Sequence, residues 1–123
     1  MITAIAFTAY PARDVAALRR FYTGVLGLTF SDPYCEDGTE KYAEAQIGSG
    51  CFSLMTSDWM EVAPGSCAAV AFEVDDIERS FADLGKHGIP TPEIHETPVC
   101  KLGSFRDPEG NKITLHQLTA PAR

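Results

Sequence analysis

The feature that most restricts the fold of this sequence is a pattern that occurs twice. In each copy an apolar, strand-like segment is followed by an amphipathic helical segment and then by several short strand-like runs. Aligning Arg13-Asp14-Val15 with Asp75-Asp76-Ile77 places Phe7 on Ala69 without a gap. A chain of 123 residues has the length of one domain. We therefore expect a single domain, residues 1–123, made of two half-repeats at about 2–56 and 67–118.

The first half-repeat is expected to begin with a strand over residues 2–9, which Tyr10-Pro11 would end. Asp14 can cap a following helix over residues 14–26, since apolar side chains recur there at helical spacing and Gly27 suits the end of a helix. Short strand-like runs separated by Gly and Asp clusters follow at 28–30, 41–47 and 51–56, and we expect them to be strands.

The second half-repeat follows residues 57–66, which have no clear period, contain Pro-Gly and predict a linker. A strand is expected over 67–74, and Asp75 with Glu78 three residues later predicts a capping box for a helix over 76–87. The turn Asp107-Pro108-Glu109-Gly110-Asn111 predicts a hairpin that joins strands 101–106 and 112–118.

Three of these motifs resemble the glyoxalase, bleomycin-resistance and extradiol-dioxygenase superfamily, the vicinal oxygen chelate proteins. They are Asp14 with Arg20-Phe21-Tyr22 and Leu26-Gly27-Leu28, then Val74-Asp75-Asp76-Ile77, and the turn at 107–111. The resemblance covers residues 2–118. It implies an α+β fold in which two βαβββ modules form one curved mixed sheet around a cavity, with the helices on the outer face. It also implies a homodimer.

The charge balance bears on the partners of the protein. Ten basic and 17 acidic residues give a net charge of −7, which argues against binding to nucleic acid or to an anionic membrane. No signal peptide or membrane-spanning run is found, so we expect a cytoplasmic protein. The resemblance implies that its partner is a small molecule. The cysteines form no metal-binding spacing and are expected to be free thiols, Cys35, Cys51, Cys67 and Cys100.

The metal site of the superfamily is the feature in which this sequence departs from the resemblance. Metal-dependent members bind one divalent ion through His or Gln, Glu, His and Glu, and the resemblance places these ligands at Phe7, Ser53, Ala69 and Thr114. Phenylalanine and alanine have no lone pair, and neutral hydroxyl groups are poor ligands. We therefore expect no cofactor, no metal at these positions and no glyoxalase I activity. A divalent cation at a non-standard site is the alternative.

His116 lies two residues after Thr114 and therefore shares its face of the predicted strand. We expect this imidazole to point into the cavity, with Glu96 or Glu44 as the preferred carboxylate partner and Glu73 as another candidate. A hydrogen-bonded core histidine and a metal ligand are the alternatives. His116 and Glu96 are the candidate catalytic residues.

The expected ligand pocket contains residues from both half-repeats: Phe7, Glu44, Ser53, Trp59, Ala69, Glu73, Cys100 and Thr114. Trp59 suits either a dimer interface or an aromatic wall over a ligand. Cys100 is either a nucleophile or an inert buried thiol.

Three functions remain open at this point. The first is a metal-independent small-molecule binder, as in the bleomycin-type sequestration proteins of the superfamily. The second is an enzyme of the lyase or dioxygenase type, with a relocated acid/base or metal set centred on His116. The third is a structural or regulatory dimer whose cavity is filled by its own side chains, such as Phe7.

Overall fold

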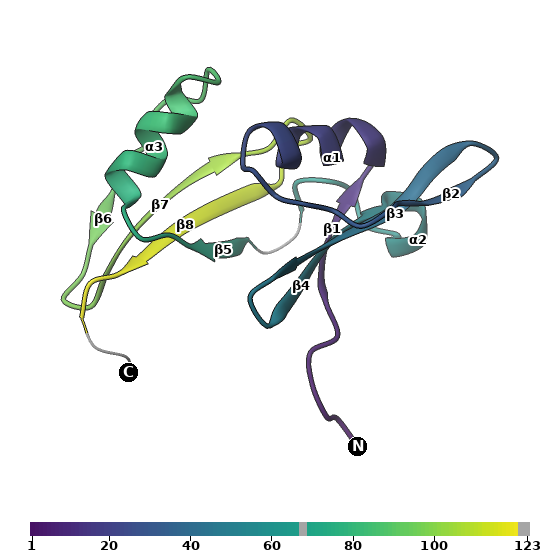
Figure 1. Ribbon diagram of the computed structural model, residues 1–123, viewed down its shortest axis with the longest axis horizontal. Coiled ribbons are helices and arrows are strands. Elements are labelled where there is room, and N and C mark those ends of the chain that lie inside the picture. Colours follow the sequence, from purple (N-terminus) through teal and green to yellow (C-terminus); the bar gives the residue numbers. More distant parts are fainter. Residues whose placement is uncertain (67–68, 121–123) are drawn as a thin grey trace. The chain divides into compact units, whose positions relative to one another are not determined.

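The computed structural model describes residues 1–66 and 69–120, and it divides the chain into two compact units. The first unit is Met1–Cys67 with Pro108–Asn111, and the second is Ala68–Asp107 with Lys112–Arg123. Each contains one βαβββ module with a four-stranded mixed sheet (Figure 1), which confirms the predicted α+β class and the duplication. Among the described residues the strands form two hydrogen-bonded sheets of four, whereas the resemblance implied a single sheet.

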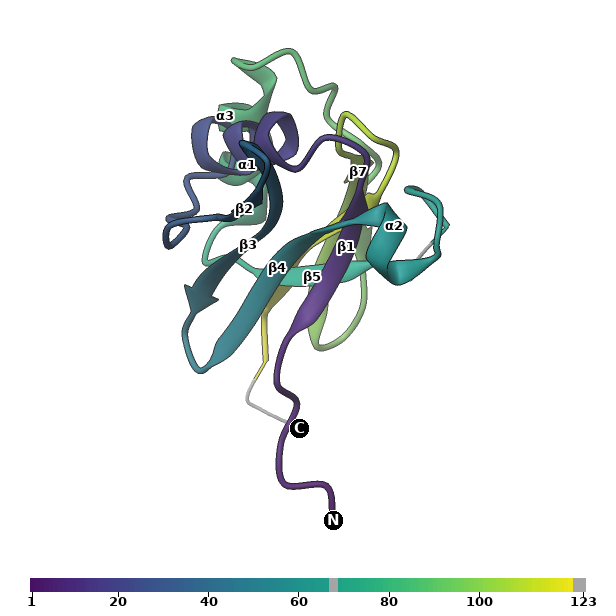
Figure 2. The ribbon, with the colours of Figure 1, turned by 90° about the vertical axis from the view of Figure 1, so that its right-hand side faces the viewer.

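The first sheet has the strand order β1-β4-β3-β2, with β1 parallel to β4 and the other neighbours antiparallel. Figure 2 shows β1 and β4 side by side, with α2 following the end of β4. Asp14 caps α1 as predicted, because its Oδ1 accepts a hydrogen bond from N of Ala17 at 3.0 Å. The elements of this unit are β1 (Thr8–Ala12), α1 (Val15–Gly24), β2 (Tyr34–Glu36), β3 (Thr39–Ile47), β4 (Gly50–Thr56) and α2 (Ser57–Met60).

The core of the first unit lies between α1 and one face of its sheet. The Tyr10 ring meets Phe52 edge-on at 5.7 Å, and the Tyr22 ring lies 5.1 Å from Phe52. Val15 and Leu18 of α1 are buried with them. This arrangement requires the apolar residues of β1 and β4 to alternate toward the helix, as the period of a strand allows.

Several predictions for the first unit are wrong. The first strand begins at Thr8, not at residue 2, and it contains Tyr10-Pro11; proline is tolerated because β1 is an edge strand. Residues 28–30 form no strand, and β2 lies further along the chain. Residues 57–60 form the helix α2 rather than a linker, and since this single turn buries no residue it produces no periodic signal.

The second sheet has the order β5-β8-β7-β6, and β5 is parallel to β8. The helix α3 packs Ile77, Phe81 and Leu84 against the sheet, where Ile113 and Leu115 are also buried. The elements of this unit are β5 (Val70–Glu73), α3 (Ile77–Gly85), β6 (His95–Glu96), β7 (Cys100–Arg106) and β8 (Lys112–Leu118).

Two predictions for the second unit need correction. The N-cap of α3 is Asp76, whose Oδ1 accepts from N of Arg79 at 3.1 Å, so Asp75 and Glu78 form no capping box. The strand expected over 67–74 is confined to β5, and its first two positions, including Cys67, lie outside the described residues.

The predicted hairpin between β7 and β8 is confirmed, with Gly110 at a φ of 89°. Its tip belongs to the first unit. The Glu109 carboxylate accepts from N of Arg13 at 2.7 Å and from N of Asp14 at 3.1 Å. Asn111 is 1% exposed and accepts from N of Gly65 at 2.8 Å. The turn therefore stabilises the start of α1. No helix in the described part of the chain is long and apolar enough to cross a membrane.

Candidate functional site

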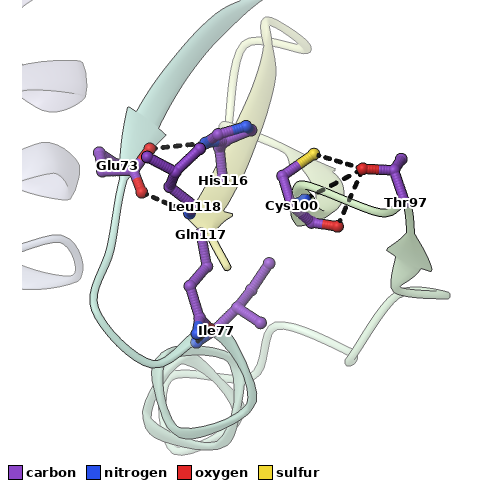
Figure 3. Close-up of polar contacts among 7 residues, drawn as sticks. All are labelled: Glu73, Ile77, Thr97, Cys100, His116, Gln117 and Leu118. Carbon is purple, nitrogen blue, oxygen red and sulfur yellow. Dashed lines mark hydrogen bonds and ion pairs between the residues drawn. The ribbon is translucent and has the colours of Figure 1, made fainter. Parts of the chain in front are cut away.

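The second sheet carries a carboxylate–imidazole pair on the face opposite α3 (Figure 3). His116 lies on β8 directly beside Glu73 on the parallel strand β5, and its Nδ1 is 2.5 Å from Oε1 of Glu73. The second oxygen, Oε2, accepts from the backbone N of Leu118 at 2.7 Å. Because Gln117, the residue between them, accepts from N of Ile77 at the start of α3, His116 and Leu118 must lie on the other face.

The prediction that Glu96 or Glu44 is the preferred partner of this imidazole is wrong, since Glu73 has that role. Glu96 lies opposite Lys101 on β7, one position out of phase with the His116 face. Lys101 in turn binds Glu78 of α3 at 2.9 Å, so Glu96 shares the helix-side face of the sheet. Glu96 is therefore not a member of the carboxylate–imidazole pair, which lies on the other face of the sheet.

Two further side chains of the expected pocket have hydrogen-bond partners within the second unit. Thr114 is 8% exposed, and its Oγ1 lies 2.8 Å from Oγ of Ser104 on the neighbouring strand. Cys100 is buried, with its Sγ 3.2 Å from Oγ1 of Thr97 (Figure 3). The register opposes Cys100 to Leu118, which places the thiol on the same face as His116.

On the first sheet the corresponding face holds a polar cluster of Tyr42, Glu44, Cys51 and Ser53. The Tyr42 hydroxyl donates to Oε2 of Glu44 at 2.7 Å, and the Cys51 thiol lies 3.5 Å from the same oxygen. Ser53 is fully buried and donates to O of Thr8 at 3.4 Å.

Burial and the Glu44 carboxylate both raise the pKa values of Tyr42 and Cys51 in this cluster. Burial is the main cause that raises the pKa of Tyr42, and the hydrogen bond to Glu44 raises it further, although Ser53 opposes the rise. The pKa of the Cys51 thiol is raised by burial and by Glu44. Both groups are therefore held in their neutral forms. Glu44 also lines an open depression of about 400 Å³ together with Phe30, Ser31, Thr29 and Gln46.

The remaining pocket candidates are more exposed. Phe7 precedes β1, is 42% exposed and meets the Tyr42 ring edge-on at 6.0 Å. Trp59 lies on α2, is 47% exposed and has its ring 6.0 Å from that of Tyr34, which is 52% exposed. Ala69 is exposed and lies just before β5. Tyr34 and Trp59 together form an exposed aromatic pair on the first unit.

The positions of the superfamily's metal ligands do not fit a divalent cation in this chain. Phe7 and Ala69 have no donor atom, and the hydroxyls of Ser53 and Thr114 are hydrogen-bonded within their own sheets. Neither sheet therefore presents a carboxylate or imidazole at these positions. No group of three or more His, Cys, Asp or Glu side chains suited to a metal ion occurs in the described ranges 1–66 and 69–120.

The sequence predictions missed several polar partners: Tyr42, Cys51, Thr97 and Ser104. One of them had a usable signal. The turn at 107–111 sets the hairpin register, and counting outward from it pairs Ser104 with Thr114. The Tyr42–Glu44–Cys51 contacts had none, because they depend on the register of β3 against β4.

Comparison with known proteins agrees with the fold and with the residues that carry the resemblance. The sequence profile of the Glyoxalase/Bleomycin resistance protein/Dioxygenase superfamily matches residues 4–115, and the chain belongs to this superfamily.

Individual relatives are similar along nearly their whole lengths. The Escherichia coli (strain K12) protein YaeR, described as uncharacterized, is 25% identical over 115 residues, covering 86% of this chain and 89% of YaeR. The structure of TnmS3, an antibiotic binding protein from Streptomyces sp. CB03234, matches with a TM-score of 0.79 at 24% identity, covering 96% of this chain and 98% of TnmS3. A lactoylglutathione lyase from Agrobacterium tumefaciens matches with a TM-score of 0.74 at 22% identity, over 95% of both chains.

Proposed function

We propose that this protein binds small molecules without a metal ion, through the sheet faces that lie opposite α1 and α3. The observation that carries the proposal is the state of the two hydroxyl groups at metal-ligand positions. Thr114 is hydrogen-bonded to Ser104, and Ser53 to the backbone of its own sheet. A hydroxyl that is already hydrogen-bonded within the protein contributes little to binding a cation, whereas the same face suits hydrogen bonding to an uncharged or weakly charged ligand.

The expected pocket residues divide between the two faces. His116 and Glu73 would contact a polar group of the ligand, while Thr114, Cys100 and Ala69 would form the surrounding wall. On the first unit Phe7, Glu44 and Ser53 would have the equivalent parts, and Trp59 would lie at the margin or in a subunit interface. The antibiotic-binding description of TnmS3 supports this class of function, and the similarity to a lactoylglutathione lyase supports the alternative below.

The test is ligand binding by protein dialysed against EDTA. A panel of antibiotics from several chemical classes, bleomycin included, is screened by thermal shift and followed by calorimetry. We expect at least one compound to bind with an affinity that added Zn²⁺ or Ni²⁺ leaves unchanged. A panel in which every ligand requires added metal would contradict the proposal.

A second candidate function is catalysis by the carboxylate–imidazole pair. Its support is the 2.5 Å contact, because a carboxylate on Nδ1 orients the ring for acid/base work at Nε2. In that case His116 is the catalytic residue, Glu73 positions it, and Glu96 stays a prediction. Turnover of a bound panel compound that is lost in His116→Ala supports this candidate. We expect no turnover of the methylglyoxal–glutathione hemithioacetal.

We also propose that the chain functions as a homodimer and as one domain of 123 residues. The exposed Tyr34–Trp59 pair supplies apolar surface suited to a subunit interface. Light scattering at working concentration should give twice the chain mass of 13.3 kDa, and Trp59→Ser should lower it. A monomer at every concentration would remove this proposal.

A further inference from the structure

We propose that the Glu73–His116 pair selects ligands that carry an aromatic hydroxyl group, which donates its hydrogen bond to Nε2 of His116. This inference rests on the proposed function, since it names the class of small molecule bound at the same site.

Glu73 fixes the tautomer of the neutral ring. A carboxylate only accepts hydrogen bonds, so the contact of 2.5 Å requires the hydrogen on Nδ1. Nε2 then carries a lone pair and can only accept. The carboxylate is held from its other side, because Oε2 accepts from N of Leu118 at 2.7 Å. Within the described residues the only polar contact found for the half-buried His116 ring is the one that Nδ1 makes with Glu73.

The neighbours of the imidazole are apolar or already paired. Leu102 on β7 lies directly opposite His116, and Leu118 lies two residues further along β8 on the same face, 37% exposed. The nearby hydroxyls of Thr114 and Ser104 are bound to each other at 2.8 Å. A flat apolar ring can bury its surface against the two leucines while its hydroxyl meets Nε2. Aromatic hydroxyls also donate more strongly than aliphatic ones, because they are more acidic.

The first experiment compares 2-naphthol with 2-methoxynaphthalene by calorimetry. The two probes have the same ring system, but only the first can donate a hydrogen bond. We expect the protein to bind 2-naphthol about five- to tenfold more tightly, the range that one net hydrogen bond supplies. His116→Phe keeps a flat ring without nitrogen and should reduce the ratio to below about twofold. His87→Phe, an exposed histidine beyond α3, is the matched control and should keep the preference.

The second experiment tests Glu73 as the positioning residue. In Glu73→Gln the backbone N of Leu118 holds the amide oxygen, so the NH₂ group faces Nδ1 and moves the ring hydrogen to Nε2. The ¹⁵N shifts of labelled histidine should show Nδ1–H in the unaltered protein and Nε2–H in the variant. The preference for 2-naphthol should disappear together with this change, although the fold is retained.

Equal binding of the two probes, a preference that survives His116→Phe, or Nε2–H in the unaltered protein would each overturn the inference. Binding of other panel compounds would then leave the proposed function standing. If neither probe binds but panel compounds do, the ligand class is wrong. If no compound of any kind binds, the proposed function fails as well.

Discussion

In the first module Ala9 lies beside Ser53, and two residues further along both strands Pro11 lies beside Met55. In the second module the equivalent neighbours are Ala71 with Thr114 and Glu73 with His116. The strand register is the same in both halves. The residue types differ most at one pair of neighbouring positions. The apolar pair Pro11–Met55 of the first module is replaced by the carboxylate–imidazole pair Glu73–His116 in the second.

The opposite faces of the same strands show much less divergence. Tyr10 and Leu54 of the first module correspond to Phe72 and Leu115 of the second, and all four are aromatic or aliphatic. These positions must pack under a helix, so only apolar residues are tolerated there. Packing therefore limits the residue types on one face of each sheet, while the other face is available for a binding site.

The largest change in the free energy of unfolding is expected at the β7–β8 hairpin, whose turn differs from that of the β3–β4 hairpin. The Asn111 side chain binds N of Gly65 and donates to O of Pro11 at 3.3 Å, whereas the β3–β4 turn of the first module has an exposed serine, Ser49. Asn111→Ala leaves two backbone groups without these partners and should lower the free energy of unfolding by about 2–4 kcal/mol. Urea unfolding measures this change. Ser49→Ala, the control, should change it by less than about 0.5 kcal/mol. Equal effects would mean that the two turns are equivalent.

A smaller change in stability is expected when a glycine that occurs in the second module only, Gly103, is replaced. Gly103 of the second module is equivalent in position to Ala43 of the first, because Gly103 lies opposite Leu115 and Ala43 lies opposite the equivalent Leu54. A methyl group on Gly103 would lie 3.0 Å from Cε2 of the buried Phe81 ring. Gly103→Ala should therefore destabilise the fold by about 1–3 kcal/mol by overpacking.

The reciprocal change provides the control for this prediction. Ala43→Gly removes a buried methyl group from a strand and should cost about 1 kcal/mol, as glycine does in a strand interior. Gly24→Ala, whose added carbon would meet no atom within 4 Å, should be neutral or slightly stabilising. A neutral Gly103→Ala would show that Phe81 can move and that the modules pack alike.

The smallest effect concerns the ion pairs that join each helix to its sheet. In the first module Arg19 binds both oxygens of Glu40, at 2.7 and 2.8 Å, and this contact lowers the pKa of Glu40. A lowered folded-state pKa gives stability that is present above the ordinary value of 4.5 and is lost as the pH falls through the folded-state value. Glu40→Gln should cost about 1 kcal/mol at pH 7 and progressively less below pH 4.

The ion pair of the second module is the matched control. Lys101 binds Glu78 through one contact of 2.9 Å, and the Glu78 side chain is 55% exposed. Glu78→Gln should therefore change the stability by less than about 0.5 kcal/mol at either pH. A larger loss for Glu78→Gln than for Glu40→Gln in denaturant titrations would reverse the expected order of the two pairs.

Much of the fold was predictable because its signals are local. The helix periodicity, the cap at Asp14 and the turn that contains Gly110 each depend on a few consecutive residues, and the structure contains all three. The first strand was placed too early, because residues 2–7 are as apolar as a strand but have no ladder partner in the described structure. Sequence also showed that Phe7, Ser53, Ala69 and Thr114 cannot supply a metal site, since this depends only on residue type.

The two modules, their superfamily and the absence of the family's metal ligands could be predicted from residue types and local patterns. The pairing of His116 with Glu73, 43 residues earlier in the chain, could be seen in the folded structure alone. The same holds for the contacts of Glu109 with the start of α1 and of Asn111 with Pro11 of β1. These contacts depend on the register of distant strands, and a shift of one residue would turn every side chain to the opposite face. The pairing of side chains across a sheet therefore depends on how distant strands pack together, whereas turns and helix caps depend on residues that are adjacent in the chain.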